Sequence, residues 1–268
     1  EASGTWIAAD ILSAFRLLDA AGRAECFALL STHFLPNADL VKQAAHDYCS
    51  TLSDRAMLRL QAAVEPPRRE LFRRINVAPG STATLVAMRG EILELLDDHP
   101  EWAGLNSDLA HLFHAWFNGG FLVLRRIDWD TSAAVLERLI RYESVHQIRG
   151  WDDLHRRLAA DRRCYAFFHP ALPDDPLIFI EIALTRRVCD AVQLLLDPES
   201  PVIDPKEART AMFYSITNCH AGLRGIALGN LLIKQVIEDL RHAVPQVKTF
   251  ATISPVPHLR KWLTASAE

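Results

Sequence analysis

The turn that decides the fold lies in the second half of the chain and reads Gly222-Leu223-Arg224-Gly225-Ile226-Ala227-Leu228-Gly229-Asn230. A strand-like run at 211–217 precedes it, and an amphipathic helical run at 231–243 and a further strand-like run at 247–253 follow it. Gly225 and Gly229 let the backbone approach a ligand closely. Because the free N–H groups and the dipole at a helix start favour negative charge, this pattern predicts a pyrophosphate-binding turn.

The spacing of the glycines distinguishes this turn from two common phosphate-binding motifs. Dinucleotide-binding folds use G-x-G-x-x-G, P-loop nucleotide hydrolases end their loop in Gly-Lys-Ser or Gly-Lys-Thr, and neither pattern occurs here. A structural alternative stays open, in which the segment is a tight turn with a glycine that packs against the helix. If the turn binds a ligand, the candidate residues are Arg224, Gly225, Ile226, Ala227, Leu228, Gly229 and Asn230.

The rest of the second half also alternates strands with turns. Two apolar runs at 164–169 and 177–184 flank the turn Pro173-Asp174-Asp175-Pro176, which predicts a hairpin. The first half differs, because nearly everything up to about residue 148 has helical periodicity, with start signals at Asn37 and Ser53. We therefore predict an α+β multidomain protein, with an all-α helical domain at 1–148 and an α/β domain at 149–268.

Composition and charge exclude several classes of protein. The 268 residues carry a net charge of −4 with scattered arginines, which argues against a nucleic-acid partner. No apolar stretch is long enough to cross a bilayer, so we expect no membrane partner. The five cysteines are odd in number and show no paired spacing, which favours reduced thiols and a cytoplasmic location.

Several pairs of reactive side chains have simpler interpretations. His111 and His114 share a helix face, but no carboxylate or cysteine nearby completes a ligand set, so no metal is expected. Cys219-His220 suggests a nucleophile next to a base, yet it also suits the loop that leads into the glycine turn. The Gly-x-Ser-x-Gly motif of α/β-hydrolases is absent. These pairs therefore indicate no second chemistry.

Longer motifs carry a resemblance to a known family. Arg224-Gly225-x-x-Leu228-Gly229 between a strand and a helix resembles the acyl-CoA pyrophosphate loop of the GCN5-related N-acetyltransferase (GNAT) fold. The whole chain is similar to malonyl-CoA decarboxylases, most of all bacterial ones, in these runs: Trp116-Phe117-Asn118, Gly120-Phe121-Leu122-Val123-Leu124, Tyr142-Glu143-Ser144-Val145-His146, Gly150-Trp151-Asp152-Asp153-Leu154, Arg162-Arg163-Cys164-Tyr165, Phe213-Tyr214-Ser215-Ile216-Thr217, Leu231-Leu232-Ile233-Lys234, Phe250-Ala251-Thr252-Ile253-Ser254-Pro255-Val256-Pro257 and Lys261-Trp262-Leu263.

This resemblance implies a GNAT-like catalytic domain that converts malonyl-CoA to acetyl-CoA and CO2 in fatty acid metabolism, without metal or organic cofactor. Catalysis then needs donors aimed at the developing enolate and an acid for its carbon. The family's Ser-Pro-x-Pro serine corresponds to Ser254, and its catalytic histidine is expected beyond residue 268. His258 stands where the family usually has glycine. The resemblance also implies a homotetramer assembled through the helical domain.

Two alternative functions and one expectation about the chain ends complete the predictions. An acyl-CoA-dependent N-acetyltransferase would share the fold and the turn, whereas a catalytically silent acyl-CoA sensor would lack the histidine. The chain starts at Glu1 without an initiator Met, and the resemblance stops before the family's histidine. We therefore expect a trimmed chain whose GNAT-like domain is truncated at its C-terminal end, and a targeting segment upstream stays open.

Overall fold

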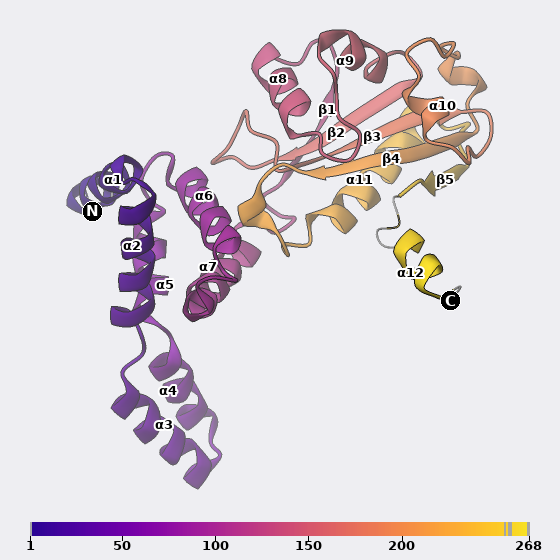
Figure 1. Ribbon diagram of the computed structural model, residues 1–268. Coiled ribbons are helices and arrows are strands. Elements are labelled where there is room, and N and C mark those ends of the chain that lie inside the picture. Colours follow the sequence, from indigo (N-terminus) through magenta and orange to yellow (C-terminus); the bar gives the residue numbers. More distant parts are fainter. Residues whose placement is uncertain (1, 255, 257–258, 267–268) are drawn as a thin grey trace. The chain divides into compact units, whose positions relative to one another are not determined.

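The computed structural model describes residues 2–254, 256 and 259–266 and divides the chain into two compact units (Figure 1). Unit 1 comprises the residues up to Asn118 together with His220–Ile226, and unit 2 comprises Gly119–Cys219 together with the residues from Ala227 onward. The first half of the glycine turn therefore packs with the helical unit. The domain boundary expected near residue 148 stays a prediction.

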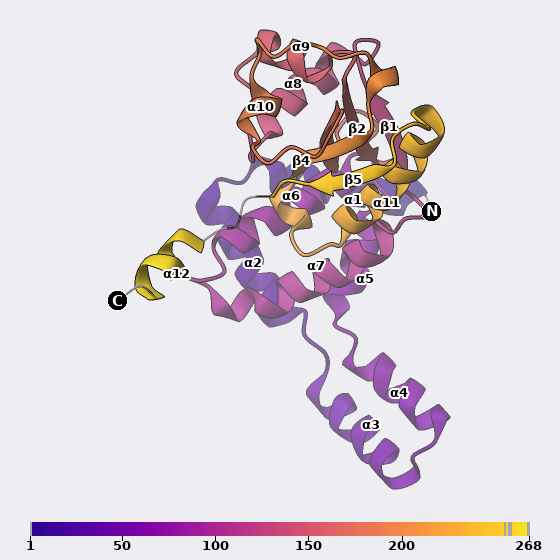
Figure 2. The same cartoon turned by 90° about the vertical axis from the view of Figure 1, so that its right-hand side faces the viewer.

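Unit 1 is helical (Figure 2). Its α-helices are α1 (Ala2–Leu17), α2 (Ala20–His33), α3 (Ala38–Thr51), α4 (Asp54–Val64), α5 (Pro67–Ile75), α6 (Ser81–Glu94) and α7 (Ala103–Trp116). Short 3-10 turns at Pro100–Trp102 and Ala221–Leu223 complete it. The start signals act as predicted, because the Asn37 side chain accepts the N–H groups of Asp39 and Leu40, and Ser53 accepts that of Ala56.

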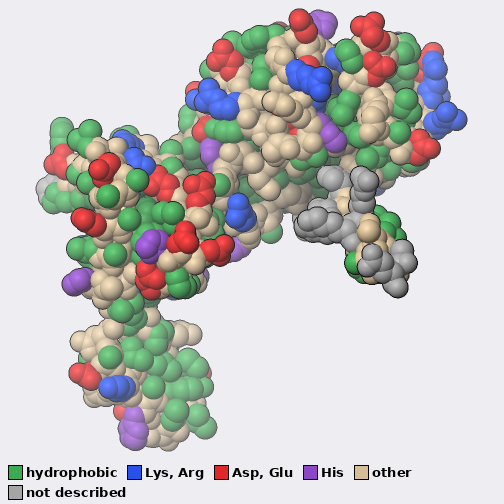
Figure 3. All heavy atoms as spheres, in the orientation of Figure 1, with side chains coloured by type: hydrophobic (Ala, Val, Ile, Leu, Met, Phe, Trp, Pro, Cys, Tyr) green, Lys and Arg blue, Asp and Glu red, His purple; other side chains and the backbone are tan. Residues whose placement is uncertain are grey.

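Helices α3 and α4 pack on one another as a helical hairpin with little core of its own. Ala44 of α3 and Ala56 of α4 are the buried residues described for these two helices. Hydrophobic side chains gather on the surface of the hairpin in Figure 3. The exposed large apolar residues of α3, α4 and the residues that border them are Leu40, Leu52, Leu58 and Val64. The hairpin therefore presents apolar surface to its surroundings.

Unit 2 contains a sheet of five strands in the order β1-β2-β3-β4-β5. The strands are β1 (Val123–Ile127), β2 (Arg162–Phe168), β3 (Ile178–Thr185), β4 (Thr210–Asn218) and β5 (Thr249–Thr252). Neighbouring strands are antiparallel except for β4 and β5, which are parallel. The helices of unit 2 are α8 (Ala133–Tyr142), α9 (Trp151–Arg157), α10 (Gln193–Leu196), α11 (Leu228–Ala243) and α12 (Leu259–Ser266), with a 3-10 turn at Pro205–Glu207.

The sheet is covered on both faces. Helices α8 and α9 lie over one face and α11 over the other (Figures 1 and 2). The apolar residues of α8, β2 and β3 form one buried cluster that includes Leu139, Ala166 and Phe179. Because β3 is buried on both faces, it carries the apolar run that the sequence shows at 177–184.

The predicted fold class is confirmed, since a helical part precedes an α/β part with a strand–turn–helix–strand unit. The predicted hairpin is also confirmed, as β2 pairs with β3 in antiparallel register. The expectation of helix through nearly all of 1–148 is wrong at Val123–Ile127. This segment forms β1 because it pairs along its whole length with β2.

Candidate functional site

Gly222 is a packing residue of unit 1. A Cβ atom at this position would lie 1.8 Å from the main-chain oxygen of Val86 and 3.1 Å from the nitrogen of Gly90, both on α6. A side chain there would overlap the helix backbone, so only glycine permits this approach. The structural alternative for the turn therefore holds at Gly222.

Gly225 has a different reason to be glycine. Its φ is +84°, a left-handed conformation that side-chain-bearing residues adopt rarely, and a Cβ built there meets no heavy atom within 4 Å. A Cβ at Gly229 would make an ordinary contact of 3.7 Å with Cδ1 of Ile178. The two glycines of the predicted motif thus differ, because only Gly225 combines a glycine-specific conformation with open space.

Helix α11 begins directly after the turn. Ala227 is its N-cap residue, and no side chain caps the first N–H groups of the helix. These groups have no partner within the helix, and the helix dipole adds positive charge beside them. Arg224, Gly225, Ala227 and Asn230 are exposed, whereas the side chains of Ile226 and Leu228 are buried. The buried pair can offer a ligand only its backbone.

The pairing of β4 with β5 ends beside a β-bulge in β4 that sequence reasoning missed. On the β3 side, Glu181 pairs with Ser215 and Ile182 pairs with Phe213, so Tyr214 is the extra residue of β4. On the other side, the pairing of β4 with β5 ends at Phe213 and Thr252. The bulge is a non-local feature, and the apolar run of β4 carries no signal for it.

Ser254 lies close to the end of the pairing between β4 and β5. The N–H of Ile253 donates to the Phe213 oxygen at 2.9 Å, and Ser254 is the next residue. It is exposed and lies outside any helix or strand. Of the other residues in that segment, Pro255, Pro257 and His258 lie outside the described residues. The described part of the segment therefore leaves the Ser254 hydroxyl open to a ligand.

Beneath this region lies a buried polar network. The Glu143 carboxylate accepts Ser215 Oγ at 2.9 Å, Thr217 Oγ1 at 3.0 Å and the N–H groups of Val145 and His146. These bonds satisfy the buried oxygens of Glu143 and tie the segment after α8 to β4. The network is thus a fixed support for the strand that leads into the turn.

A second buried carboxylate, Glu181 on β3, pairs with Arg157 at 2.7 Å. Burial raises the pKa of Glu181 to about 8, because the cost of desolvation and the charge of Glu143 outweigh the attraction of Arg157. Arg157 is shared, since its guanidinium also bonds Asp153 and the main-chain oxygen of His146. One buried cation therefore holds several acceptors.

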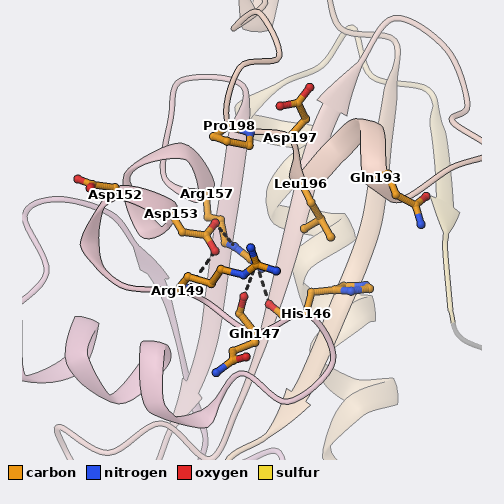
Figure 4. A pocket seen from close by; sticks show the side chains of 10 residues that line it. All are labelled: His146, Gln147, Arg149, Asp152, Asp153, Arg157, Gln193, Leu196, Asp197 and Pro198. Atoms are coloured by element: carbon orange, nitrogen blue, oxygen red, sulfur yellow. Dashed lines mark hydrogen bonds and ion pairs between the residues drawn. The ribbon is translucent and has the colours of Figure 1, made fainter.

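Arg157 also lines a cavity of about 640 Å³ in unit 2 (Figure 4). The lining residues are His146, Gln147, Arg149, Asp152, Asp153, Arg157, Gln193, Leu196, Asp197 and Pro198. They come from α9, α10 and the segments beside them (Figure 4). No residue of the glycine turn is among them, and neither is Ser254. The cavity is therefore not the predicted site.

The other candidates from the sequence gain no support. Burial raises the pKa of the Cys219 thiol well above its usual value, so this cysteine is protonated and a poor nucleophile. No group of three or more His, Cys, Asp and Glu side chains within the described residues is arranged to hold a metal ion. In the same part of the chain, no helix is both long and apolar enough to traverse a bilayer.

The strand–turn–helix–strand unit, in which β4 and β5 are parallel neighbours, has the expected acetyltransferase-like arrangement. The family models then specify the chain further. The model of the malonyl-CoA decarboxylase N-terminal domain matches residues 34–117, and that of the malonyl-CoA decarboxylase C-terminal domain matches residues 120–268. The chain belongs to the malonyl-CoA decarboxylase family.

Individual relatives agree with this assignment. The chain is 37% identical over 211 residues to the mitochondrial malonyl-CoA decarboxylase of the goose Anser anser anser. The matched region covers 76% of this chain and 42% of the relative. Crystal structures of malonyl-CoA decarboxylases from Rhodopseudomonas palustris (47% identity, TM-score 0.91) and Agrobacterium vitis (48% identity, TM-score 0.94) match 99% and 98% of this chain. The chain spans 65% and 64% of those structures.

Proposed function

We propose that the protein decarboxylates malonyl-CoA to acetyl-CoA and CO2. Membership of the malonyl-CoA decarboxylase family supports this activity. The chain spans less than half of the goose relative, so the activity is proposed for the full-length protein. The observation that carries the proposal is the position of Ser254, one residue after the last bond between β5 and β4. In a decarboxylase family, a free hydroxyl at that point suits the reacting end of a thioester.

The chemistry requires a place for two electrons. The bond between the carboxylate carbon and the methylene carbon of the malonyl group breaks, CO2 leaves, and the electron pair moves onto the thioester oxygen as an enolate. An acid then delivers a proton to the methylene carbon and gives acetyl-CoA. Because the thioester carbonyl is itself the electron sink, we propose that no metal or organic cofactor is needed.

We assign the Ser254 hydroxyl to the developing charge. A hydrogen bond from a donor to the thioester oxygen becomes stronger as negative charge grows on that oxygen. It therefore lowers the activation barrier more than it improves substrate binding. The acid is the histidine that the family resemblance assigns to a position beyond residue 268. In this mechanism Ser254 stabilises the enolate oxygen, and the histidine protonates the enolate carbon.

We assign the CoA phosphates to residues 224–230. Gly225 leaves open space on the side where other residues carry a Cβ, and the N–H groups at the start of α11 have no capping side chain. The exposed Arg224 adds a cation. Free N–H groups, a helix start and a guanidinium together suit a pyrophosphate.

We also propose that the protein forms a homotetramer through its helical part. The support is the α3–α4 hairpin, whose exposed leucines lack a partner within the hairpin, and the resemblance to an oligomeric family. A second copy would bury this apolar surface. A cytoplasmic location and a role in fatty acid metabolism belong to the same proposal, supported by five free cysteines and by the substrate.

The test is release of CO2 from malonyl-CoA by the full-length protein, with acetyl-CoA as the second product. We expect turnover after chelation of divalent ions, and activity that disappears on chelation and returns with a metal would contradict the mechanism. The alternative N-acetyltransferase would instead release CoA only when an amine acceptor is added. Acetyl-CoA consumption that depends on an amine, without CO2 release from malonyl-CoA, would replace the proposal.

A further inference from the structure

Arg89 joins helix α6 to the glycine turn within unit 1. Its Nη1 atom donates to the main-chain oxygen of Gly222 at 2.5 Å and to that of Arg224 at 3.0 Å. Its Nε atom donates to Oδ1 of Asn106 on α7 at 2.9 Å. Arg89 is 5% exposed, and its bond to the Gly222 oxygen is buried, so that bond is shielded from water. A single buried side chain therefore holds two carbonyls of the turn in place.

The charge of Arg89 has no carboxylate opposite it. Its acceptors are two main-chain oxygens and one amide oxygen, and no ion pair to a carboxylate occurs within the described residues. Burial and the neighbouring Arg224 lower the pKa of Arg89, although a guanidinium stays protonated. A buried cation with only neutral partners is costly, because no opposite charge offsets the loss of its hydration.

The contact between α6 and the turn is close enough to be rigid. The backbone of Gly222 lies against α6 where a Cβ would strike the Val86 oxygen, and a Cβ at Gly90 would lie 3.4 Å from the Gly222 nitrogen. Because two glycines remove the side chains between these backbones, the turn cannot move relative to α6 without breaking the Arg89 bonds. Arg89 and Gly90 are adjacent, so two successive positions of α6 contact the turn, one by hydrogen bonds and the other by close packing.

These bonds set the direction of the peptide group between Arg224 and Gly225. In a trans peptide the C=O and N–H groups point in opposite directions, so a carbonyl turned toward Arg89 turns the Gly225 N–H away from it. No acceptor binds that N–H among the described residues. Gly225 also has the positive φ and the open space described above. Arg89 therefore keeps a free donor that points away from its own guanidinium group.

We propose that Arg89 is a positioning residue for substrate binding: it holds the Gly222–Gly225 backbone so that the Gly225 N–H faces a CoA phosphate. The inference rests on the proposed function only in its choice of ligand. It gives the helical part a role in substrate binding in addition to assembly. Because Arg89 acts through the backbone of the turn, replacing it should weaken the binding of the CoA phosphates. The contacts of the acyl group should stay the same.

The experiment compares two substrates in the full-length protein. For Arg89→Gln we expect KM for malonyl-CoA to rise about tenfold, equivalent to about 1.4 kcal/mol, with kcat within about threefold. Malonyl-pantetheine lacks the phosphates, so its kcat/KM should change little. Arg68→Gln is the matched control, since Arg68 is equally buried on α5 and pairs with Asp108 at 2.5 Å. It should lower the melting temperature without weakening CoA binding.

Two further measurements keep the test decisive. If Arg89→Gln does not fold, Asn106→Ala releases the Nε bond alone and should weaken CoA binding in the same direction by a smaller factor. Equal losses on malonyl-CoA and malonyl-pantetheine, or unchanged CoA affinity in a folded Arg89 variant, would overturn the inference. Calorimetric titration with CoA needs no turnover, so an inactive wild type would refute the proposed function while still testing Arg89.

Discussion

Phe213 of β4 and Thr252 of β5 are the last paired residues of the parallel strands, and β5 ends there while β4 continues to Asn218. The extra residue Tyr214 makes a bulge in β4 at this point, which bends the strand and ends the ladder. Ser254 follows Thr252 by two residues and is exposed. The proposed catalytic hydroxyl therefore lies just past the end of the pairing between β4 and β5, which makes Ser254 the first position to test.

Ser254→Ala should act on the transition state. Removing one donor to a developing oxyanion typically lowers kcat by about 10²–10³. KM should change far less, because most of the binding energy comes from the CoA portion. Ser254 is exposed, so the melting temperature should stay the same. Steady-state kinetics and a melting curve of the full-length variant measure all three.

Ser107→Ala on α7 is the matched control, as another exposed serine in the described chain. It should leave kcat, KM and the melting temperature as they are. Near-normal kcat in a stable Ser254→Ala protein would remove this hydroxyl from the mechanism.

Gly225→Asn should weaken CoA binding by about tenfold, since a side chain then occupies the space proposed for a phosphate. Asn is chosen because it accepts a positive φ more readily than other residues with a side chain. Gly225→Val would confound the test, because a β-branched residue at φ +84° strains the backbone by about 1–3 kcal/mol. Titration with CoA, together with a melting curve, separates binding from strain.

The control for strain is Gly150→Asn. Gly150 also has a positive φ, +114°, and a Cβ there meets nothing within 4 Å. This variant should lose stability without losing CoA affinity. If Gly225→Asn folds and binds CoA as the wild type does, the turn is structural only.

Glu181→Gln should flatten the pH dependence of stability. The folded pKa of Glu181, about 8, lies above the usual value for a glutamate. Between the two values the folded state holds a proton that the unfolded state has lost. The contribution of Glu181 to the free energy of unfolding is therefore fully present below about pH 4.5. It is lost as the pH rises from there through about 8, by up to about 1.4 kcal/mol per pH unit.

Denaturant unfolding at several pH values between 5 and 8 measures this effect. Relative to wild type, the Glu181→Gln variant should become more stable as the pH rises across that range. Glu207→Gln removes an exposed carboxylate that pairs with Arg186 at the surface, so its difference from wild type should not vary with pH. Parallel curves for wild type and Glu181→Gln would contradict the raised pKa.

Leu58→Glu on the α3–α4 hairpin should shift the protein from a tetramer to a smaller species. Leu58 is 65% exposed in the chain, so the substitution costs the folded chain little, whereas a charge buried between copies is costly. Light scattering at micromolar concentration measures the change. Val188→Glu is the control, because Val188 is 56% exposed in unit 2. A wild-type protein that is monomeric at that concentration would refute the assembly.

The sequence by itself determined the features that depend on neighbouring residues. Helix starts at Asn37 and Ser53 follow from side chains that bond N–H groups two or three positions away. The hairpin of β2 and β3 and the strand–turn–helix order around Gly225 follow from local patterns as well. Motifs along the whole chain then sufficed to identify the family.

Only the tertiary structure decided what depends on distant residues. Val123–Ile127 is a strand because β2 lies beside it, and no local pattern distinguishes it from the helices before it. The bulge at Tyr214 exists only through the register with β3. Gly222 needs to be glycine because Val86, far away in the chain, lies against it, and Arg89 reaches the turn across the same contact. Packing between segments remote in sequence fixes these positions, and local propensity carries no information about such contacts.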